Sequence, residues 1–284
     1  MAAHEIAFAN EVGQGLADNE LPAYAPMLAA YQRSHARELR EMIGALPLRP
    51  GDRVLDMACG AGVYSRWLAE RVGPGGLVVG ADISRAFLEQ ARAQAGCGGR
   101  LAWQIGDIAG LPFADGTFDL VWCAQSMYSL PDPLAALREL ARVTRPGGTV
   151  AVFENDMLHH LVLPWPAELE LAVRQAQLQS VRATASEPAK FFIGRELCAV
   201  FAEAGLCGCQ VRPYSAVRQA PLGPDERRYL ASYLRDLGQR ARPLLEPGLR
   251  ARFDELVAPG SPGYLLDQPG FYVTYIDMLA CATV

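Results

Sequence analysis

The sequence has few basic residues and no long uninterrupted hydrophobic run. Its 284 residues include 26 Lys and Arg against 31 Asp and Glu, a formal net charge of −5. A nucleic-acid backbone is bound through a concentrated basic field, so we expect no nucleic-acid partner. No stretch reaches the roughly 18 apolar residues of a membrane span, and the N-terminus lacks a signal-peptide pattern. These absences predict a cytoplasmic protein without a membrane span that acts on a small molecule.

Cysteine is also scarce. There are seven cysteines, an odd number without a repeated spacing, which fits reduced thiols better than a disulfide framework. The close pair Cys207 and Cys209 has no second pair nearby and no histidine at a zinc-site spacing. We therefore expect no metal site.

Short apolar runs alternate with helical patterns between residues 53 and 154. The expected strands are residues 53–57, 76–82, 101–107, 118–124 and 148–154, and the expected helices are 63–72, 84–95 and 133–144. This alternation is typical of a parallel sheet flanked by helices. The pattern resumes with a helix at 194–205 and with strands at 206–217 and 270–284. We expect an α/β fold with a Rossmann-like, mostly parallel sheet of seven strands and helices on both faces.

Three segments stand outside this alternation and have a helical period of their own. Residues 24–46 place apolar residues on one face, and residues 155–190 and 221–268 contain further helices. We expect all three to form a lid over the ligand site. Their apolar side chains would then wall a hydrophobic pocket or, for most of them, form the core of the lid itself, namely Leu161, Leu163, Trp165, Tyr229, Tyr233 and Phe253. The predicted organisation is an N-terminal helical lid at 1–50 and a main domain at 51–284 with lid insertions at about 155–190 and 221–268.

The stretch VLDMACGAG ends the first strand in an acid that is followed by small residues at alternate positions. These small residues, Ala58, Gly60 and Gly62, let the backbone approach a ligand at the carboxyl end of the strand. Asp82 ends the second strand twenty residues after Gly62, the usual distance for a carboxylate that binds ribose hydroxyls. Asp107 ends the third strand. Each acid alone could be a helix cap or a turn residue, but together they predict a ligand site at one edge of the sheet.

Four sequence motifs of this chain resemble, in their order along the chain, those of class I S-adenosylmethionine-dependent methyltransferases. The resemblance is greatest to the ubiquinone and menaquinone biosynthesis type and its small-molecule relatives. The motifs are VLDMACGAG, GADIS, GDIAGLPFADGTFDLVWC and RPGG, all within residues 50–155. The resemblance is weak over the last two strands and hardly extends to the helical insertions. It implies a last strand that runs antiparallel to the others.

The resemblance also implies S-adenosylmethionine as cofactor and S-adenosylhomocysteine as product. The turn after the first strand would hold the methionine part through Asp56, Ala58, Gly60 and Gly62. Asp82, followed by Ile83, would bind the ribose hydroxyls, and Asp107 with Ile108 would bind the adenine. Gln125 would lie beside the methionine tail and the methyl group. Ala58 stands where many family members have glycine, and we expect its small side chain to be tolerated.

A dinucleotide-binding oxidoreductase is the main rival for the same residues. Its pyrophosphate needs the spacing G-x-G-x-x-G at the start of the helix. Here the spacing is A-x-G-x-G, followed by Val63 and Tyr64. S-Adenosylmethionine carries no phosphate and suits this turn better.

The lid and the lack of a basic groove favour a mid-sized, largely hydrophobic acceptor. A natural product, quinone, isoprenoid or phenol of secondary metabolism fits this description. Two alternatives stay open: an S-adenosylmethionine-binding enzyme that catalyses a non-methylating reaction such as cyclisation, and a non-catalytic cofactor-binding regulator. The protein could be a monomer or a homodimer, because the apolar helices at 24–46 and 225–239 could cover the site or meet a second subunit.

The histidines are the first candidates for a general base, since their ordinary pKa lies near neutral pH. His159 and His160 follow the fifth strand at the edge where a substrate would enter, and His35 lies on the apolar face of the N-terminal helix. A solvated pair and a satisfied core histidine are the alternative interpretations. The nearby carboxylates Glu154 and Asp156 could serve instead or bind a substrate amine. An acceptor that is already anionic would need no general base. The sequence does not distinguish between methylation of an oxygen, a carbon or a nitrogen atom.

Overall fold

The computed structural model describes residues 20–94, 99–185 and 188–284. In this part of the chain eight strands form one sheet, in the order β3-β2-β1-β4-β5-β8-β6, with β7 also paired to β8. The strands are β1 (Arg53–Met57), β2 (Leu77–Asp82), β3 (Leu101–Ile105), β4 (Phe118–Ala124), β5 (Thr144–Glu154), β6 (Leu161–Val162), β7 (Gln210–Gln219) and β8 (Tyr272–Thr283).

The predicted fold class is confirmed. The first five strands pair in parallel, and β8 runs antiparallel to β5, β6 and β7. The two-residue strand β6 is an addition that the sequence pattern did not predict, because two residues are too few to show an alternation. Central strands β1 and β4 are buried on both faces, so they appear in the sequence as continuous apolar runs.

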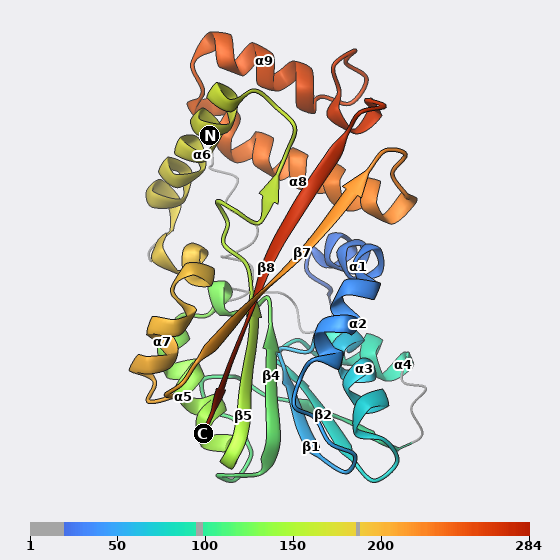
Figure 1. Cartoon of the computed structure of the whole chain (residues 1–284), viewed down its shortest axis with the longest axis vertical. Coiled ribbons are helices and arrows are strands. Elements are labelled where there is room, and N and C mark those ends of the chain that lie inside the picture. The colour runs from blue at the N-terminus through green and yellow to red at the C-terminus, as the bar shows by residue number, and fades with distance from the viewer. Residues whose placement is uncertain (1–19, 95–98, 186–187) are drawn as a thin grey trace.

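Helices cover both faces of the sheet (Figure 1). One face packs against α2 (Ala36–Gly44) and α3 (Val63–Val72), and the other against α5 (Pro133–Val143) and α7 (Leu197–Glu203). Helix α4 (Arg85–Ala93) contacts β2 and β3. Asp132 caps α5 by accepting a hydrogen bond from the Ala135 N–H at 2.9 Å, and a proline follows the cap at the first helical position.

The helix predicted over residues 24–46 is in fact two helices, α1 (Ala25–Ser34) and α2. They are separated by His35, whose φ of −109° and ψ of 15° are not helical. Because of this break, α1 packs on α8 (Pro224–Ala241) while α2 packs on α3. The prediction was wrong because the apolar period continues unchanged across the break.

Three further helices, α6 (Ala167–Thr184), α8 and α9 (Pro247–Val257), lie beyond the carboxyl end of the parallel strands, in the upper half of Figure 1. The described residues also form the 3-10 segments η1 (Met127–Ser129), η2 (Pro188–Arg195), η3 (Arg242–Leu244) and η4 (Leu265–Asp267). Strands β7 and β8 extend into this region as a long ribbon. The ribbon therefore joins the sheet to the helices above it.

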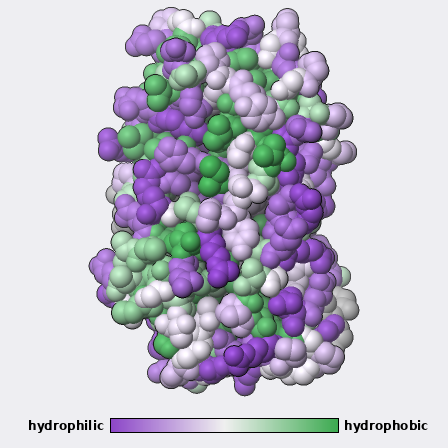
Figure 2. All heavy atoms as spheres, in the orientation of Figure 1, coloured by the Kyte–Doolittle hydropathy of each residue, from purple (hydrophilic) through white to green (hydrophobic). Residues whose placement is uncertain are grey.

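The apolar residues predicted to wall a pocket pack instead into the interior of this helical region. Leu161, Leu163, Tyr229, Tyr233 and Phe253 are each at most 7% exposed and belong to one core cluster with side chains of the sheet. Trp165 is half-buried against the same cluster. On the face shown in Figure 2, hydrophobic residues form only small separate groups between hydrophilic areas.

None of the described helices combines the length and the apolar character that crossing a membrane requires. The division into an N-terminal lid and a main domain with lid insertions stays a proposal, and residues 1–19 of that lid lie outside the described residues.

Candidate active site

The turn after β1 has an unusual backbone. Ala58, Gly60 and Gly62 all have positive φ, at 56°, 51° and 71°. This left-handed region is unfavourable for alanine by roughly 1–2 kcal/mol, so the strain at Ala58 marks the turn as a candidate functional segment. A Cβ atom added at Gly60 would meet nothing within 4 Å. The backbone at Gly60 therefore borders open space in which a ligand could lie.

Gly62 is needed for packing. A Cβ atom there would lie 2.3 Å from the Trp103 ring, and one at Gly80 would lie 2.4 Å from the same ring. The Trp103 side chain of β3 thus occupies the space that these two glycines leave. The missing side chain of Gly62 makes room for the indole, and its contact with the cofactor stays a prediction.

Asp56, at the carboxyl end of β1, is 1% exposed. The Ser65 hydroxyl of α3 donates a hydrogen bond to it at 2.5 Å. Burial, and to a lesser extent the charge of Asp82, raises the pKa of Asp56 to about 7. Near neutral pH the acid is therefore partly protonated, and a positive group beside it would favour its charged form.

Asp82, at the end of β2, holds the turn in place. One carboxylate oxygen accepts a hydrogen bond from the Gly60 N–H, and the other accepts one from the Ser84 N–H, both at 2.8 Å. The side chain is 7% exposed, and burial raises its pKa. Each oxygen keeps a further lone pair that a ribose hydroxyl could use. The next residue, Ile83, leaves 57% of its surface exposed, as expected of a side chain that a ligand would cover.

The two remaining predicted cofactor segments lie at the same edge. Asp107 is exposed and accepts a hydrogen bond from the Ala109 N–H at 2.9 Å, while Ile108 is buried. Gln125 follows β4 with a φ of 52°, and its N–H donates to the Phe153 carbonyl at 2.7 Å. The Oε1 atom of Gln125 is buried without a hydrogen-bond partner among the described residues.

Unpartnered polar atoms at this edge test whether a cofactor fits. Besides Gln125 Oε1, Tyr64 Oη and Glu154 Oε2 are buried and have no hydrogen-bond partner in the described part of the chain. Buried polar atoms without partners are rare unless a ligand or water satisfies them. Hydroxyl, amide and carboxylate groups suit the ammonium and hydroxyl groups of S-adenosylmethionine, so the residues present fit this cofactor.

The three candidate histidines differ in their surroundings. His159 is exposed. His160 is half-buried with its ring edge on Tyr233, and its Nδ1 lies 3.2 Å from the Met157 carbonyl. His35 is 2% exposed, stacks on Tyr31 at 4.5 Å and meets Tyr275 edge-on at 4.3 Å.

Burial lowers the pKa of both His35 and His160 to about 4. Both rings are therefore neutral near neutral pH. Neither has the pKa near the operating pH that is best for a general base, but a neutral ring can still accept a hydrogen bond.

The carboxylates predicted as alternatives differ from one another. Asp156 forms an ion pair with Arg195, with a second contact at 2.8 Å, and accepts the Leu158 N–H at 2.9 Å. Glu154 is fully buried, and its Oε1 accepts the N–H groups of Ser126 and Met127, each at 2.6 Å. Burial raises the pKa of Glu154 to about 8.

Asp277 of β8 is the site residue that sequence reasoning missed. It is 8% exposed, and the Tyr31 hydroxyl of α1 donates a hydrogen bond to it at 3.0 Å. Burial raises its pKa to about 7, and the Asn155 side chain favours its charged form. The available signal was a single acid inside the hydrophobic run YVTYIDMLACAT.

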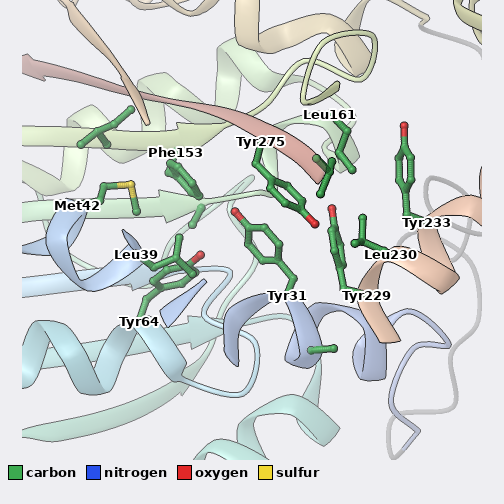
Figure 3. Packing of buried hydrophobic residues seen from close by; sticks show 14 of the residues in the cluster. Tyr31, Leu39, Met42, Tyr64, Phe153, Leu161, Tyr229, Leu230, Tyr233 and Tyr275 are labelled. Atoms are coloured by element: carbon green, nitrogen blue, oxygen red, sulfur yellow. The ribbon is translucent and has the colours of Figure 1, made fainter. Parts of the chain in front are cut away.

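Tyrosines surround this acid from three elements. Figure 3 shows Tyr31 of α1, Tyr229 of α8 and Tyr275 of β8 side by side at the end of the strands. The Tyr31 and Tyr229 ring centroids are 5.3 Å apart, and those of Tyr229 and Tyr275 are 5.9 Å apart. Among the described residues no group of three or more His, Cys, Asp or Glu side chains could hold a metal ion.

Comparison with known proteins identifies the protein family of this chain. Residues 55–152 match the family model described as a methyltransferase domain. The chain is 30% identical to the demethylmenaquinone methyltransferase of Geobacillus kaustophilus over 64% of its own length and 82% of that protein. The chain belongs to the class I S-adenosylmethionine-dependent methyltransferases. S-Adenosylmethionine is accordingly its cofactor, as the resemblance implied.

Further similarities agree with this assignment. The 27-O-demethylrifamycin SV methyltransferase of Amycolatopsis mediterranei is 34% identical over 50% of this chain and 51% of that protein. The crystal structure of the YcgJ protein from Bacillus subtilis shares the fold with a TM-score of 0.55, at 20% identity, over 88% of this chain and 98% of that one. The chain spans about half the length, or less, of the first curated relatives that it matches.

Proposed function

We propose that this methyltransferase transfers a methyl group from S-adenosylmethionine to a mid-sized, largely hydrophobic small molecule. The observation that carries the proposal is the set of buried polar groups at one sheet edge beneath the helical region. Asp56, Asp82 and the open backbone at Gly60 lie beside the unpartnered atoms of Tyr64 and Gln125. The cofactor supplies an activated methyl group, and the chain supplies its binding, its orientation and protection from water.

Cofactor binding is assigned to the predicted residues. Asp82 would bind the ribose hydroxyls with the lone pairs that its two backbone contacts leave unused. Ile83, which is largely exposed, would cover the adenine together with Ile108, beside Asp107. Gln125 and Asp56 would bind the methionine part.

Methyl transfer is an in-line displacement. A protein contributes to it by orienting the acceptor toward the methyl group and by excluding water. The helical region above the sheet packs apolar side chains of α1, α6, α8 and α9 into one core. Within it His35 presents a buried Nε2 atom that lacks a partner among the described residues. We assign His35 the role of accepting a hydrogen bond from the acceptor, and we give His159 and His160 a lesser role at the entrance.

The relatives support a small-molecule acceptor. Their names give demethylmenaquinone and 27-O-demethylrifamycin SV as substrates of those proteins. The second name favours an acceptor from secondary metabolism. Reaction in the cytoplasm, and action as a monomer or homodimer, are further predictions that oligomer analysis and localisation of a tagged chain would check.

The test begins with native mass spectrometry of the purified chain during titration with S-adenosylmethionine and S-adenosylhomocysteine. Binding of both leads to incubation with quinols, phenols and macrocyclic natural products, followed by mass analysis. A product heavier by one methylene, with formation of S-adenosylhomocysteine, supports the proposal. A product of unchanged mass indicates a cyclase-like reaction, and binding without any turnover across the panel indicates a regulator.

A further inference from the structure

Four buried carboxylates at the active-site edge have no positive partner among the described residues. Asp56 and Asp82 are assigned above to the methionine part and the ribose of the cofactor, which leaves Glu154 and Asp277 without an assigned ligand. Glu154 is 0% exposed and Asp277 is 8% exposed. None of the ion pairs formed by the described residues includes either side chain. In contrast, the neighbouring buried acid Asp156 is neutralised by Arg195. Burying an unpaired carboxylate costs several kcal/mol, so an arrangement with two of them needs a reason.

Capping alone does not explain Glu154. Its Oε1 atom accepts two backbone N–H groups, a task that the neutral side chain of glutamine would also perform. The second oxygen, Oε2, is buried and unpartnered within the described residues. The hydrogen-bonded N–H groups belong to Ser126 and Met127, the residues directly after Gln125. The carboxylate therefore lies at the loop assigned to the methyl side of the cofactor.

Asp277 and Glu154 approach the carboxyl end of the strands from opposite faces of the sheet. Strands β5 and β8 pair Glu154 with Met278, so Asp277, one residue earlier in β8, points to the other face, where Tyr31 donates a hydrogen bond to it. Burial, and then the charges of Asp277, Asp56 and Glu154, raise the pKa of the Tyr64 hydroxyl. Three carboxylates from three strands thus influence one phenol whose oxygen has no hydrogen-bond partner in the described chain. Asp56, Glu154, Asp277 and Tyr64 are the acidic group of this site.

We propose that Glu154 and Asp277 provide the countercharge for the methyl-bearing sulfonium, so that the protein binds S-adenosylmethionine in preference to S-adenosylhomocysteine. The proposal rests on the proposed function. The two molecules share their adenosine, ammonium and carboxylate groups, but only S-adenosylmethionine has a positive sulfur. After methyl transfer the sulfur is neutral, and the attraction that the carboxylates exert on it is lost. The countercharge therefore favours product release.

The effect belongs to binding and not to the chemical step. A negative charge near the sulfonium stabilises the bound cofactor at least as much as the transition state, in which the positive charge is already leaving the sulfur. Interactions that do not strengthen in the transition state do not accelerate the reaction. Affinity is accordingly the quantity that tests the proposal.

Proton binding gives a second readout. In the free protein, burial raises the pKa values of Glu154 and Asp277 to about 8 and about 7, so both are partly protonated near pH 7.5. A bound cation lowers both pKa values and releases protons. The other titratable groups that face the pair are Asp56, Cys123, Tyr31, Tyr64, Tyr128, Tyr229 and Tyr275. The cysteine and the tyrosines have pKa values raised above their ordinary range, so they stay protonated at this pH.

The experiment is isothermal titration calorimetry of the full chain at pH 7.5 with three ligands. S-Adenosylmethionine carries the sulfonium, sinefungin carries an amine in its place, and S-adenosylhomocysteine is neutral there. The wild type should bind the two cationic ligands about tenfold or more tighter than the neutral one, as one pKa unit of charge coupling gives. Titration in buffers of different ionisation enthalpy should show greater proton release for the cationic ligands.

The variants Glu154→Gln and Asp277→Asn keep the hydrogen-bond acceptors but remove the charge. Each should weaken binding of the cationic ligands about tenfold while changing binding of S-adenosylhomocysteine much less. Asp236→Asn is the matched control, because Asp236 is a half-buried acid of α8 whose pKa burial also raises. It should leave the preference unchanged.

Equal wild-type affinity and equal proton release for the three ligands would overturn the proposal, and this result does not depend on the folding of any variant. A uniform loss for all three ligands in both folded variants would also overturn it. Failure of the proposed function gives a different result, since none of the ligands would then bind to the folded protein.

Discussion

Replacement of Asp82 by alanine should damage both the cofactor site and the fold. Its two oxygens accept the N–H groups of Gly60 and Ser84, so one side chain joins the turn after β1 to the start of α4. Alanine would leave two N–H groups without their charged acceptor. The carboxylate is nearly buried, so water replaces these contacts only in part.

The magnitude follows from these contacts. A hydrogen bond to a charged group contributes about 1.5–3 kcal/mol, and partial hydration offsets some of the loss. We expect Asp82→Ala to lower the free energy of unfolding by about 2–4 kcal/mol. The loss of contacts to the ribose should weaken cofactor binding by roughly 10- to 100-fold. S-Adenosylmethionine and S-adenosylhomocysteine should be affected alike, because both contain the ribose.

Urea denaturation gives the change in stability, and calorimetric titration of both ligands gives the change in affinity. Asp115→Ala is the control, because Asp115 has a side chain that is 80% exposed and pairs with Arg142. Such surface pairs contribute about 1 kcal/mol or less. A folded Asp82→Ala protein with wild-type affinity for both ligands would refute the assignment of Asp82 to the ribose.

Three further predictions concern the turn, the lid and pH. Gly62→Ala should lower the free energy of unfolding, because the new Cβ would overlap Trp103, whereas Gly60→Ala should mainly weaken cofactor binding. Urea denaturation measures the first effect and calorimetry the second. The prediction is refuted if the two variants behave alike in both assays. Arg218→Met should lower the free energy of unfolding by about 3 kcal/mol, because Glu226 loses its ion-pair partner and Glu38 keeps only the exposed Arg37. Arg33→Met, at an exposed pair, should lower it by about 1 kcal/mol or less, and equal denaturation midpoints for the two variants would contradict this. In the ligand-free protein, the Tm should fall as the pH rises from about 6.5 to 8. The raised pKa values of Asp56, Glu154 and Asp277 make the folded state bind more protons than the unfolded chain, so deprotonation favours unfolding. A Tm that rises in this window would contradict the prediction.

The sheet and the cofactor edge were predictable because their signals are local. Strand, turn and acid follow one another within a few residues at Asp56, at Asp82 and at Asp107, and the parallel topology brings the three ends together. The hydrogen bond between Asp82 and Gly60 was not predictable, since it joins residues 22 apart in sequence. The role of Gly62 in making room for Trp103 likewise depends on how β3 packs against the turn.

The surroundings and the pKa values of the candidate histidines could not be predicted from the sequence. His35 was predicted on one continuous helical face, yet it separates two helices and is buried among tyrosines from distant elements. Its burial lowers its pKa to about 4, the reverse of what suits a general base. The environment that shifts the pKa is assembled by tertiary packing, so no local pattern could have predicted it.

The last strand explains why the acceptor side of the site was the hardest part to predict. Through Met278–Thr283, β8 completes the sheet beside β5, and through Thr274 and Tyr275 it pairs with β6 in the helical region. Asp277 lies at the junction of these two parts, where Tyr31 of the N-terminal helix reaches it across 246 residues of sequence. A contact of that span joins the N-terminal helices to a buried acid of the last strand. The N- and C-terminal parts of the chain therefore meet beside the candidate site, and only the central motifs are visible as a local pattern.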